Sequence, residues 1–349
     1  MTAPAPLRPP LQLRGSSRLA TLVAVLLTAL AAVFATTSPA GATSPWHEAD
    51  HNASTPDSPA MAYYLGSHVE VIRGQDNALW FNVDGGPFNH IGGVTYAAPT
   101  ITSFRGELWI WHTGQNGDVW GQTLANRNEP NHQRWYWSSA IQFRTQNIGG
   151  SGSTGRPTSG PAVAAAPDNL HFIVVGANER IYHGFMDANR NFSSWSEMPG
   201  GARTESAAAA STSPDNRLTV LHRGTDNRIY RQGLYLNNWQ WDRTWQRVPN
   251  TNTDAAPSIA YNSYDRLMTE AWRDAGTGQV LTSESVTYAA ENTAPHGVPR
   301  NNNVTSPSAP RVSYGPNGVD VTIRGGNFYD VQGNYYRANA IYVYYGYPG

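Results

Sequence analysis

Two short motifs in this chain have the residue spacing of metal-binding sites. His47–His51 (HEADH) matches the H-E-x-x-H pattern, in which two histidines one helical turn apart bind zinc and the glutamate activates a water. That pattern works only on a stable helix, and the polar, proline-containing residues around it predict none. Asp187–Asn191 (DANRN) resembles the start of a calcium loop but lacks its glycine and distant glutamate. We interpret the first motif as chance and the second as a turn, and we expect no metal and no other cofactor.

The elements around these motifs are predicted to be β-hairpins that recur along the chain. The clearest copy is Arg217–Gln232 (RLTVLHRGTDNRIYRQ), in which two β-rich runs flank the turn Gly224–Asn227. Glycine and Asx residues tolerate the backbone angles of a tight reversal, so the pattern is typical of a hairpin. Several copies repeat an arginine before the turn and an aromatic residue after it. The further copies are His68–Phe81, Glu107–Gln122 and Leu170–Gly184, with weaker ones at Arg266–Ser283 and Val319–Asn327.

A short strand of small residues, usually led by a proline, is predicted about ten residues before each hairpin. The anchors of these strands are separated by 40, 62, 46, 50 and 53 residues, and some hairpins are followed by a tryptophan-led strand. Four antiparallel strands at this period are typical of a β-propeller blade, whose innermost strand has little room. We predict an all-β fold, a single β-propeller over residues 58–349 with about six four-stranded blades; five or seven blades are the alternatives. The long gap is assigned to insertions around Ala125–Gln133 and Gly149–Gly155.

The N-terminal segment has the composition of a secretory signal peptide. Residues 1–18 contain three arginines and no acidic residue, Leu19–Ala35 is apolar, and Ala40–Ala42 is a small-x-small cleavage pattern. We therefore predict a signal peptide over residues 1–42, a flexible N-terminal arm over 43–57, and a secreted, extracellular bacterial protein. An uncleaved anchor is the alternative, because 17 apolar residues are close to the length that spans a membrane.

The composition of the remaining chain argues against several classes of function. Residues 43–349 hold four more acidic than basic side chains, which gives no reason to expect nucleic acid or an anionic membrane as partner. Cysteine is absent, so the fold depends on its core and not on disulfides. Lysine is absent too, which excludes Schiff-base chemistry and pyridoxal attachment. The oligomeric state stays open.

The turn segments Gly74–Trp80 (GQDNALW) and Gly224–Tyr230 (GTDNRIY) resemble the repeat of the Photorhabdus-lectin-like β-propellers, which are similar in architecture to tectonins and fucose-binding lectins. The resemblance covers about residues 58–327. It implies sugar binding in shallow pockets between adjacent blades, where a sugar stacks on tryptophan or tyrosine beside arginine. Several such weak sites would act together. The candidate sugar contacts that the resemblance marks are Arg73, Trp80, Trp120, Tyr182, Arg223 and Tyr230.

We expect a non-catalytic, multivalent lectin whose partners are glycans or glycoconjugates. The same aromatic residues could instead be inter-blade core, and Arg73 and Arg223 could be structural ion pairs. Two other functions stay open: a sialidase-like glycoside hydrolase and a cell-surface protein-interaction module. A glycosidase needs two carboxylates about 5–10 Å apart across a cleft, and the glutamates fall at unrelated positions of their repeats, so no catalytic residue is predicted. These glutamates are Glu107, Glu179, Glu197, Glu205, Glu270 and Glu284.

Overall fold

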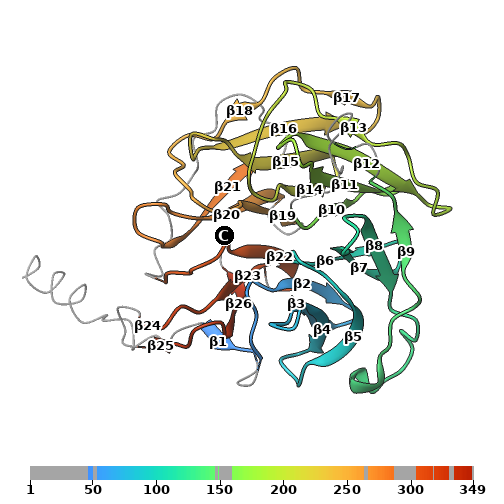
Figure 1. Cartoon of the computed structure of the whole chain (residues 1–349), viewed down its shortest axis with the longest axis vertical. Coiled ribbons are helices and arrows are strands. Elements are labelled where there is room, and N and C mark those ends of the chain that lie inside the picture. Colours follow the sequence, from blue (N-terminus) through green and yellow to red (C-terminus); the bar gives the residue numbers. More distant parts are fainter. Residues whose placement is uncertain are drawn as a thin grey trace, which may run out of the picture. The chain divides into compact units, whose positions relative to one another are not determined.

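Six antiparallel sheets surround a common axis and form a β-propeller (Figure 1). The structure is a computed structural model, and it describes residues 46–49, 53–145, 148, 159–262, 266–286, 304–316, 318–329 and 334–347. The prediction of an all-β propeller with about six blades is confirmed. Within the described residues, no helix has the length and apolar character that crossing a membrane requires.

The first three blades follow one another in chain order, each running from its innermost to its outermost strand. Blade 1 consists of β2 (Ala60–Tyr64), β3 (Ser67–Arg73), β4 (Ala78–Val83) and β5 (Asn89–Val94). Blade 2 consists of β6 (Thr100–Phe104), β7 (Glu107–Thr113), β8 (Val119–Thr123) and β9 (Ile141–Phe143), with the short 3-10 helix η1 (His132–Arg134) in the predicted insertion. Blade 3 consists of β10 (Ala162–Ala165), β11 (Asn169–Val175), β12 (Ile181–Asp187) and β13 (Ser196–Glu197). The predicted glycine-rich insertion, residues 149–155, lies outside the described residues.

The last three blades repeat this plan with additions. Blade 4 consists of β14 (Ala209–Ser213), β15 (Arg217–Arg223), β16 (Ile229–Tyr235), β17 (Gln240–Trp241) and β18 (Gln246–Arg247). In blade 5 the described strands are β19 (Ser258–Asn262), β20 (Leu267–Arg273) and β21 (Val280–Val286). Blade 6 consists of β22 (Arg311–Gly315), β23 (Gly318–Arg324), β26 (Ile341–Tyr347) and β1 (Trp46–Glu48).

The ring is closed by a strand from the start of the described chain. β1 pairs antiparallel with β26, so Trp46 lies opposite Tyr344 and Glu48 opposite Tyr342. The sequence interpretation placed these residues in an arm outside the blades, whereas the structure places Trp46–Glu48 in the sheet of blade 6. A strand directs His47 and Glu48 to opposite faces, which is not the helical geometry that the H-E-x-x-H pattern requires. The second histidine of the pattern lies outside the described residues.

One turn geometry recurs between the second and third strands of every blade. One residue of each turn has a left-handed φ between 61° and 80°, which Asn and Gly adopt most readily. In blade 6 the same turn is split by an insertion that carries the hairpin β24 (Phe328–Tyr329) and β25 (Tyr335–Tyr336). This insertion explains why the last repeat looked degenerate in the sequence. The six left-handed residues are Asn77, Gly117, Glu179, Asn227, Gly278 and Asn339.

A buried threonine or serine fastens each crossover between blades to the preceding turn. The backbone N–H of Thr95 donates to the carbonyl of Asn77 at 2.9 Å, and Thr253 makes the same bond to Asn227 at 2.8 Å. Such bonds pair backbone groups that the crossover would otherwise bury without a partner. The sequence analysis missed this repeat because threonine and serine are common in loops. The six residues are Thr55, Thr95, Thr145, Thr204, Thr253 and Ser306, all at most 2% exposed.

Candidate functional site at the blade junctions

The arginine and the aromatic residue of one repeat lie on opposite faces of their blade. In blade 1 Arg73 pairs with Leu79, and Ile72 pairs with Trp80, so alternation along the strand separates the two side chains. The Trp80 face packs against β26 of blade 6. The opposite face, with Val71, packs against blade 2. An arginine therefore faces the next blade along the chain, and an aromatic ring faces the preceding one.

Each candidate aromatic ring covers the glycine of its own turn. A Cβ added at Gly74 would lie 2.8 Å from the Trp80 ring, and the equivalent contact between Gly114 and Trp120 would be 2.6 Å. The ring is also held by its polar atom, since the Trp120 Nε1–H donates to Asn116 Oδ1 at 3.1 Å. Glycine is needed here because any side chain would collide with the ring. The same arrangement holds for Tyr182 and Tyr230 over their turn glycines.

These rings differ in how much surface they leave open. Trp80, Trp120 and Tyr230 are half-buried, whereas Tyr182 is only 8% exposed. The Tyr230 hydroxyl donates to Asp226 at 3.0 Å, and burial together with this carboxylate raises the pKa of Tyr230. Its hydroxyl therefore stays protonated at neutral pH. Three of the four predicted rings thus keep partly open faces.

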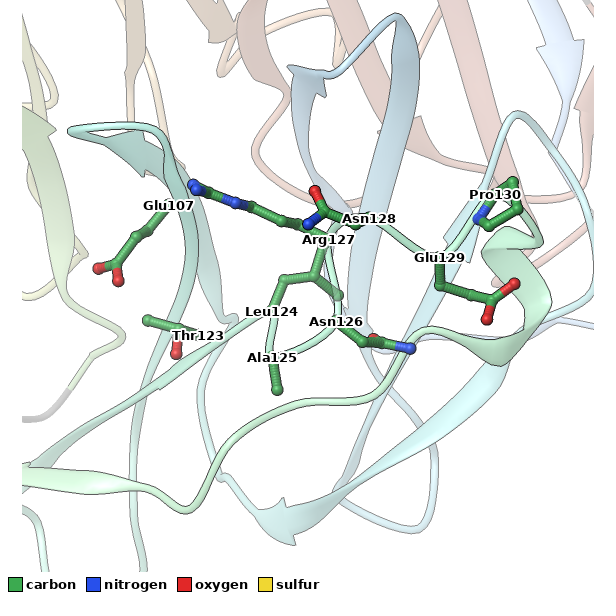
Figure 2. A pocket seen from close by; sticks show the side chains of 9 residues that line it. All are labelled: Glu107, Thr123, Leu124, Ala125, Asn126, Arg127, Asn128, Glu129 and Pro130. Carbon is green, nitrogen blue, oxygen red and sulfur yellow. The ribbon is translucent and has the colours of Figure 1, made fainter.

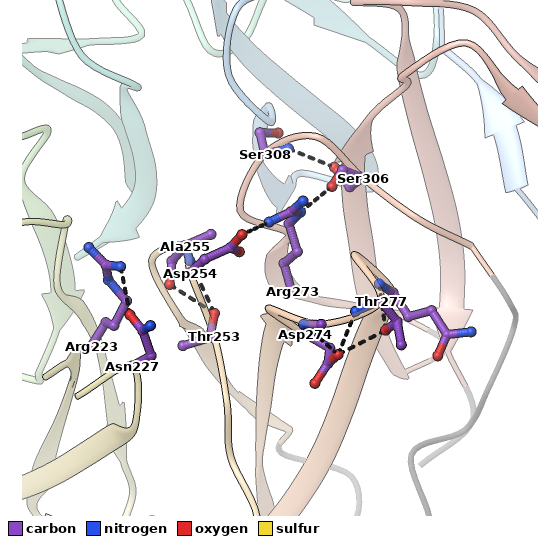
Figure 3. A network of polar contacts seen from close by, with 12 residues as sticks. Arg223, Asn227, Thr253, Asp254, Ala255, Arg273, Asp274, Thr277, Ser306 and Ser308 are labelled. Atoms are coloured by element: carbon purple, nitrogen blue, oxygen red, sulfur yellow. Dashed lines mark hydrogen bonds and ion pairs between the residues drawn. The ribbon is translucent and has the colours of Figure 1, made fainter. Parts of the chain in front are cut away.

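The candidate arginines are anchored at the start of their own blades. Arg73 Nε donates to Asp57 at 2.7 Å, and Arg223 Nη1 donates to Asn227 at 3.1 Å. Figure 3 shows the fullest version in blade 5, where Arg273 binds Asp254 and donates to the Ser306 carbonyl of the next crossover at 2.6 Å. These contacts hold the turn against the crossover, so the arginines have a structural role whatever else they do.

Ring and arginine share a junction at only three of the six positions. Trp80 faces the side of blade 6 that carries Arg324, and Trp120 faces the side of blade 1 that carries Arg73. The structure therefore does not combine Trp80 with Arg73, or Tyr230 with Arg223, in one pocket. Tyr182 faces Thr113, Tyr230 faces Val175, and Arg223 faces Leu281.

The sequence analysis missed a fifth ring at the equivalent position, Tyr342 in blade 6. It pairs with Ile323 as Trp80 pairs with Ile72, and a Cβ at Gly325 would lie 2.7 Å from its ring. The insertion in the turn of blade 6 hid it, because the ring comes after β25 instead of six residues after the glycine. Tyr342 is only 5% exposed and packs against Tyr336. The third junction that combines a ring with an arginine, Tyr342 facing the Arg273 side of blade 5, therefore has a covered ring.

Two other features bear on the alternatives left open by the sequence. A pocket of about 510 Å³ lies beside the insertion of blade 2, and Figure 2 shows its two acids, Glu107 and Glu129, pointing away from each other. This arrangement is not a pair of carboxylates across one bond. The other feature is the calcium-like segment: Asp187 accepts hydrogen bonds from the side chain and backbone of Asn191, which lower its pKa. Asp187 thus shapes a turn.

Comparison with known proteins supports the fold and leaves the sequence family open. No family model matches the chain, and no curated protein matches it in sequence. The fucose-specific lectin from Aleuria aurantia matches with a TM-score of 0.53 and 13% identity, over 78% of this chain and 89% of the lectin. A protein of unknown function from Dyadobacter fermentans matches with a TM-score of 0.56 and 10% identity, over 86% and 94% of the two chains.

A sialidase shares the same architecture. The Trypanosoma rangeli enzyme, solved with the inhibitor DANA, matches with a TM-score of 0.51 and 12% identity, over 83% of this chain and 55% of the enzyme. At such identities a structural match establishes the fold alone. The chain therefore has the fold of lectin-type propellers, and its resemblance to the Photorhabdus-lectin-like family stays at the level of the repeat motif.

Proposed function

We propose that this chain is a secreted, non-catalytic carbohydrate-binding propeller with sugar sites at two blade junctions. The observation that carries the proposal is that a half-buried tryptophan and an arginine of the neighbouring blade lie on faces turned toward the same junction. This occurs between blades 6 and 1, with Trp80 and Arg324, and between blades 1 and 2, with Trp120 and Arg73. The fold shared with a fucose-specific lectin supports the same reading.

The chemistry of the junction between blades 1 and 2 suits a sugar. The indole face of Trp120 can stack on the apolar C–H face of a pyranose ring. Arg73 uses Nε for Asp57 and Nη1 for Asn77, and a guanidinium carries five N–H donors, so donors remain for sugar hydroxyls. The anchoring bonds fix the guanidinium plane before a ligand arrives, which reduces the entropy lost on binding.

Two sites on adjacent junctions would act together on a surface that displays many glycans. Each site is shallow, so one sugar would bind weakly, and simultaneous binding would raise the apparent affinity. The apolar run and cleavage pattern in residues 1–42 support secretion, which would bring the protein to surfaces that display glycans outside the cell.

A glycan array with matched variants tests this proposal. The full chain is expressed, the protein is collected from the medium, and its mass is expected to correspond to a chain that begins at Thr43. We expect saturable binding to a group of related glycans, weakened about tenfold or more in folded Trp120→Ala, because one stacking contact is lost. Tyr230→Ala is the control, since that ring faces Val175 instead of an arginine, and it is expected to bind like the wild type.

Two outcomes would count against this assignment. Absence of binding to any glycan at high protein density would remove the lectin function. Loss of binding in Tyr230→Ala with full binding in Trp120→Ala would place the site at a junction that has no arginine. Thermal unfolding of each variant separates a lost site from a lost fold.

A further inference from the structure

The central channel of the propeller is a second cavity, separate from the outer blade junctions. The six innermost strands surround the axis in Figure 1. Residues of all six line the channel, whose volume is about 750 Å³. Its wall is made mainly of alanine, serine and threonine, which leaves space along the axis. A rigid, preformed concavity of this size can hold a small ligand. The six strands are β2, β6, β10, β14, β19 and β22.

Among the described residues that line the channel, Arg311 is the one basic side chain in this wall of small residues, which also holds the acidic side chains of Asp57 and Glu205. Arg311 begins β22 and pairs with Thr322, the residue two before the end of β23. In each of the other five blades, the first residue of the innermost strand also pairs with the residue two before the end of the second strand. All six first residues therefore lie at one level of the channel. The fold therefore needs only a small side chain at this level. The five equivalents are Ala60, Thr100, Ala162, Ala209 and Ser258.

The positive charge of Arg311 is not matched by a partner of its own. Among the described residues its side chain makes no hydrogen bond or ion pair. Asp57 lines the same channel, but its carboxylate is bound by Arg73 at 2.7 Å. The charge of Asp57 acts on Arg324 as well as on Arg311. The Nε of Arg324 is buried without a hydrogen-bond partner among the described residues. Asp57 thus serves three arginines, and the other acidic residue of the wall, Glu205, already lies 3.8 Å from Arg223.

This imbalance is unfavourable in the empty protein. Burial lowers the pKa of both Arg311 and Arg324, although Asp57 acts in the opposite direction. A partly buried cation without a partner costs free energy, which a bound anion would recover. A guanidinium presents parallel N–H groups that match the two oxygens of a carboxylate.

We propose that the central channel binds a small carboxylate-bearing ligand, with its carboxylate on Arg311. The tyrosines Tyr63, Tyr261 and Tyr314 also line the channel, and they lie three residues further along their strands at another level. Their hydroxyls and rings would contact a polar, ring-shaped body attached to the carboxylate. A sugar acid has this combination. The site differs from the sugar sites at the blade junctions in that it uses neither Trp80 nor Trp120, although Asp57 acts on Arg311 and on the junction residue Arg324 alike.

Calorimetric titration with glucuronate tests the site, with glucose as the neutral analogue of the same ring and sulfate as an anion of different shape. The wild type is expected to bind glucuronate, and to bind glucose and sulfate at least about tenfold more weakly. Arg311→Gln is expected to lose glucuronate binding by a similar factor. Arg105→Gln, which removes an exposed arginine paired with Asp168, is the control and should bind normally. Crystals soaked in glucuronate should show the ligand at Arg311.

Each other outcome would overturn a stated part of this proposal. No heat of binding for the wild type would remove the site, and retained binding in Arg311→Gln would place it elsewhere. Equal binding of sulfate would show that the site accepts any oxyanion and is not specific for a carboxylate. If Arg311 only filled space in the channel, Arg311→Gln and Arg311→Lys would differ in thermal unfolding temperature in the absence of ligand. The unfolding temperature of neither variant would then change when glucuronate is added. Trp120→Ala should keep glucuronate binding, which separates failure of this site from failure of the junction sites.

Discussion

The junction between blades 2 and 3 and the junction between blades 6 and 1 have the same strand geometry but opposite chemistry. Between blades 2 and 3, Trp109 and Trp111 stack at 5.1 Å, and Phe172 meets Trp111 edge-on at 4.6 Å. All three side chains are at most 1% exposed. This junction is an aromatic core whose stability comes from burial and packing.

The junction between blades 6 and 1 adds buried polar groups to its apolar contacts. Glu70 accepts a hydrogen bond from Asn82 Nδ2 at 2.8 Å, and His68 Nε2 lies 3.2 Å from Asp320 Oδ2. Glu70 and Asp320 are each 1% exposed. The two ends of the described chain meet next to this junction, within the sheet of blade 6, through β1 and β26. The comparison predicts that the stability contributed by the junction between blades 2 and 3 does not depend on pH, whereas the stability contributed by the junction between blades 6 and 1 does.

The largest effect is expected from removing aromatic packing between blades 2 and 3. Trp111→Ala should lower the free energy of unfolding by about 3–5 kcal/mol, because the cavity between packed rings cannot collapse. The ring fills space that even a Cβ on Gly121 would invade, since that Cβ would lie 2.2 Å away. Urea denaturation measures the loss. Trp239→Ala is the control, because that side chain is 45% exposed, and equal losses for the two variants would contradict the packing argument.

A pH-dependent effect is expected at the junction between blades 6 and 1. Burial raises the pKa of Glu70 from 4.5 to about 7, so the folded protein keeps its proton where the unfolded chain has lost it. The contribution of Glu70 to stability is therefore greatest below pH 4.5 and declines as pH rises to 7. Over that interval the decline is about 3 kcal/mol. Glu70→Gln should abolish it and make the protein more stable than the wild type at pH 8.

The measurement is the difference in unfolding free energy between Glu70→Gln and the wild type, followed from pH 4 to pH 8. The difference is needed because buried histidines have lowered pKa values, so their contribution falls as pH falls. Glu107→Gln, at an exposed carboxylate, serves as control. A difference that does not change with pH would show that Glu70 is already ionised in the folded protein. The histidines are His112, His171, His183 and His222.

The sequence predicted the parts of the molecule that each repeat builds from its own residues. Gly224–Asn227 predicts its hairpin because the turn needs glycine and Asx angles locally. What lies between blades could not be predicted in this way. His68 meets Asp320 between blades 1 and 6, some 250 residues apart in the chain, and no local pattern marks that contact. The place of Trp46–Glu48 in blade 6 was missed for the same reason.

In the candidate site, too, the features within one hairpin could be predicted from the sequence, and the contacts between blades could not. The alternation of strand residues, applied to Arg73 and Trp80 within one hairpin, already implies opposite faces. Which ring then meets which arginine depends on the order of blades around the axis. Tyr342 was missed because an insertion changed its spacing, and Arg311 because a single arginine at the start of a strand has no signature.

The smallest effect is expected from one threonine hydrogen bond at each junction, donated from the second strand of blade 6 in one case and from the first strand of blade 2 in the other. Thr322 Oγ1 donates to the Pro59 carbonyl at 2.7 Å between blades 6 and 1, and Thr100 Oγ1 donates to the Pro161 carbonyl at 2.6 Å between blades 2 and 3. Thr322→Val and Thr100→Val should each lower the free energy of unfolding by about 1 kcal/mol, the net value of such a bond. Urea denaturation at pH 7 measures both. Equal losses would show that the two junctions differ through their buried side chains and not through this bond. A much larger loss in Thr322→Val would mean that the bond also stabilises the closure of the ring, where β1 is held by only three paired residues.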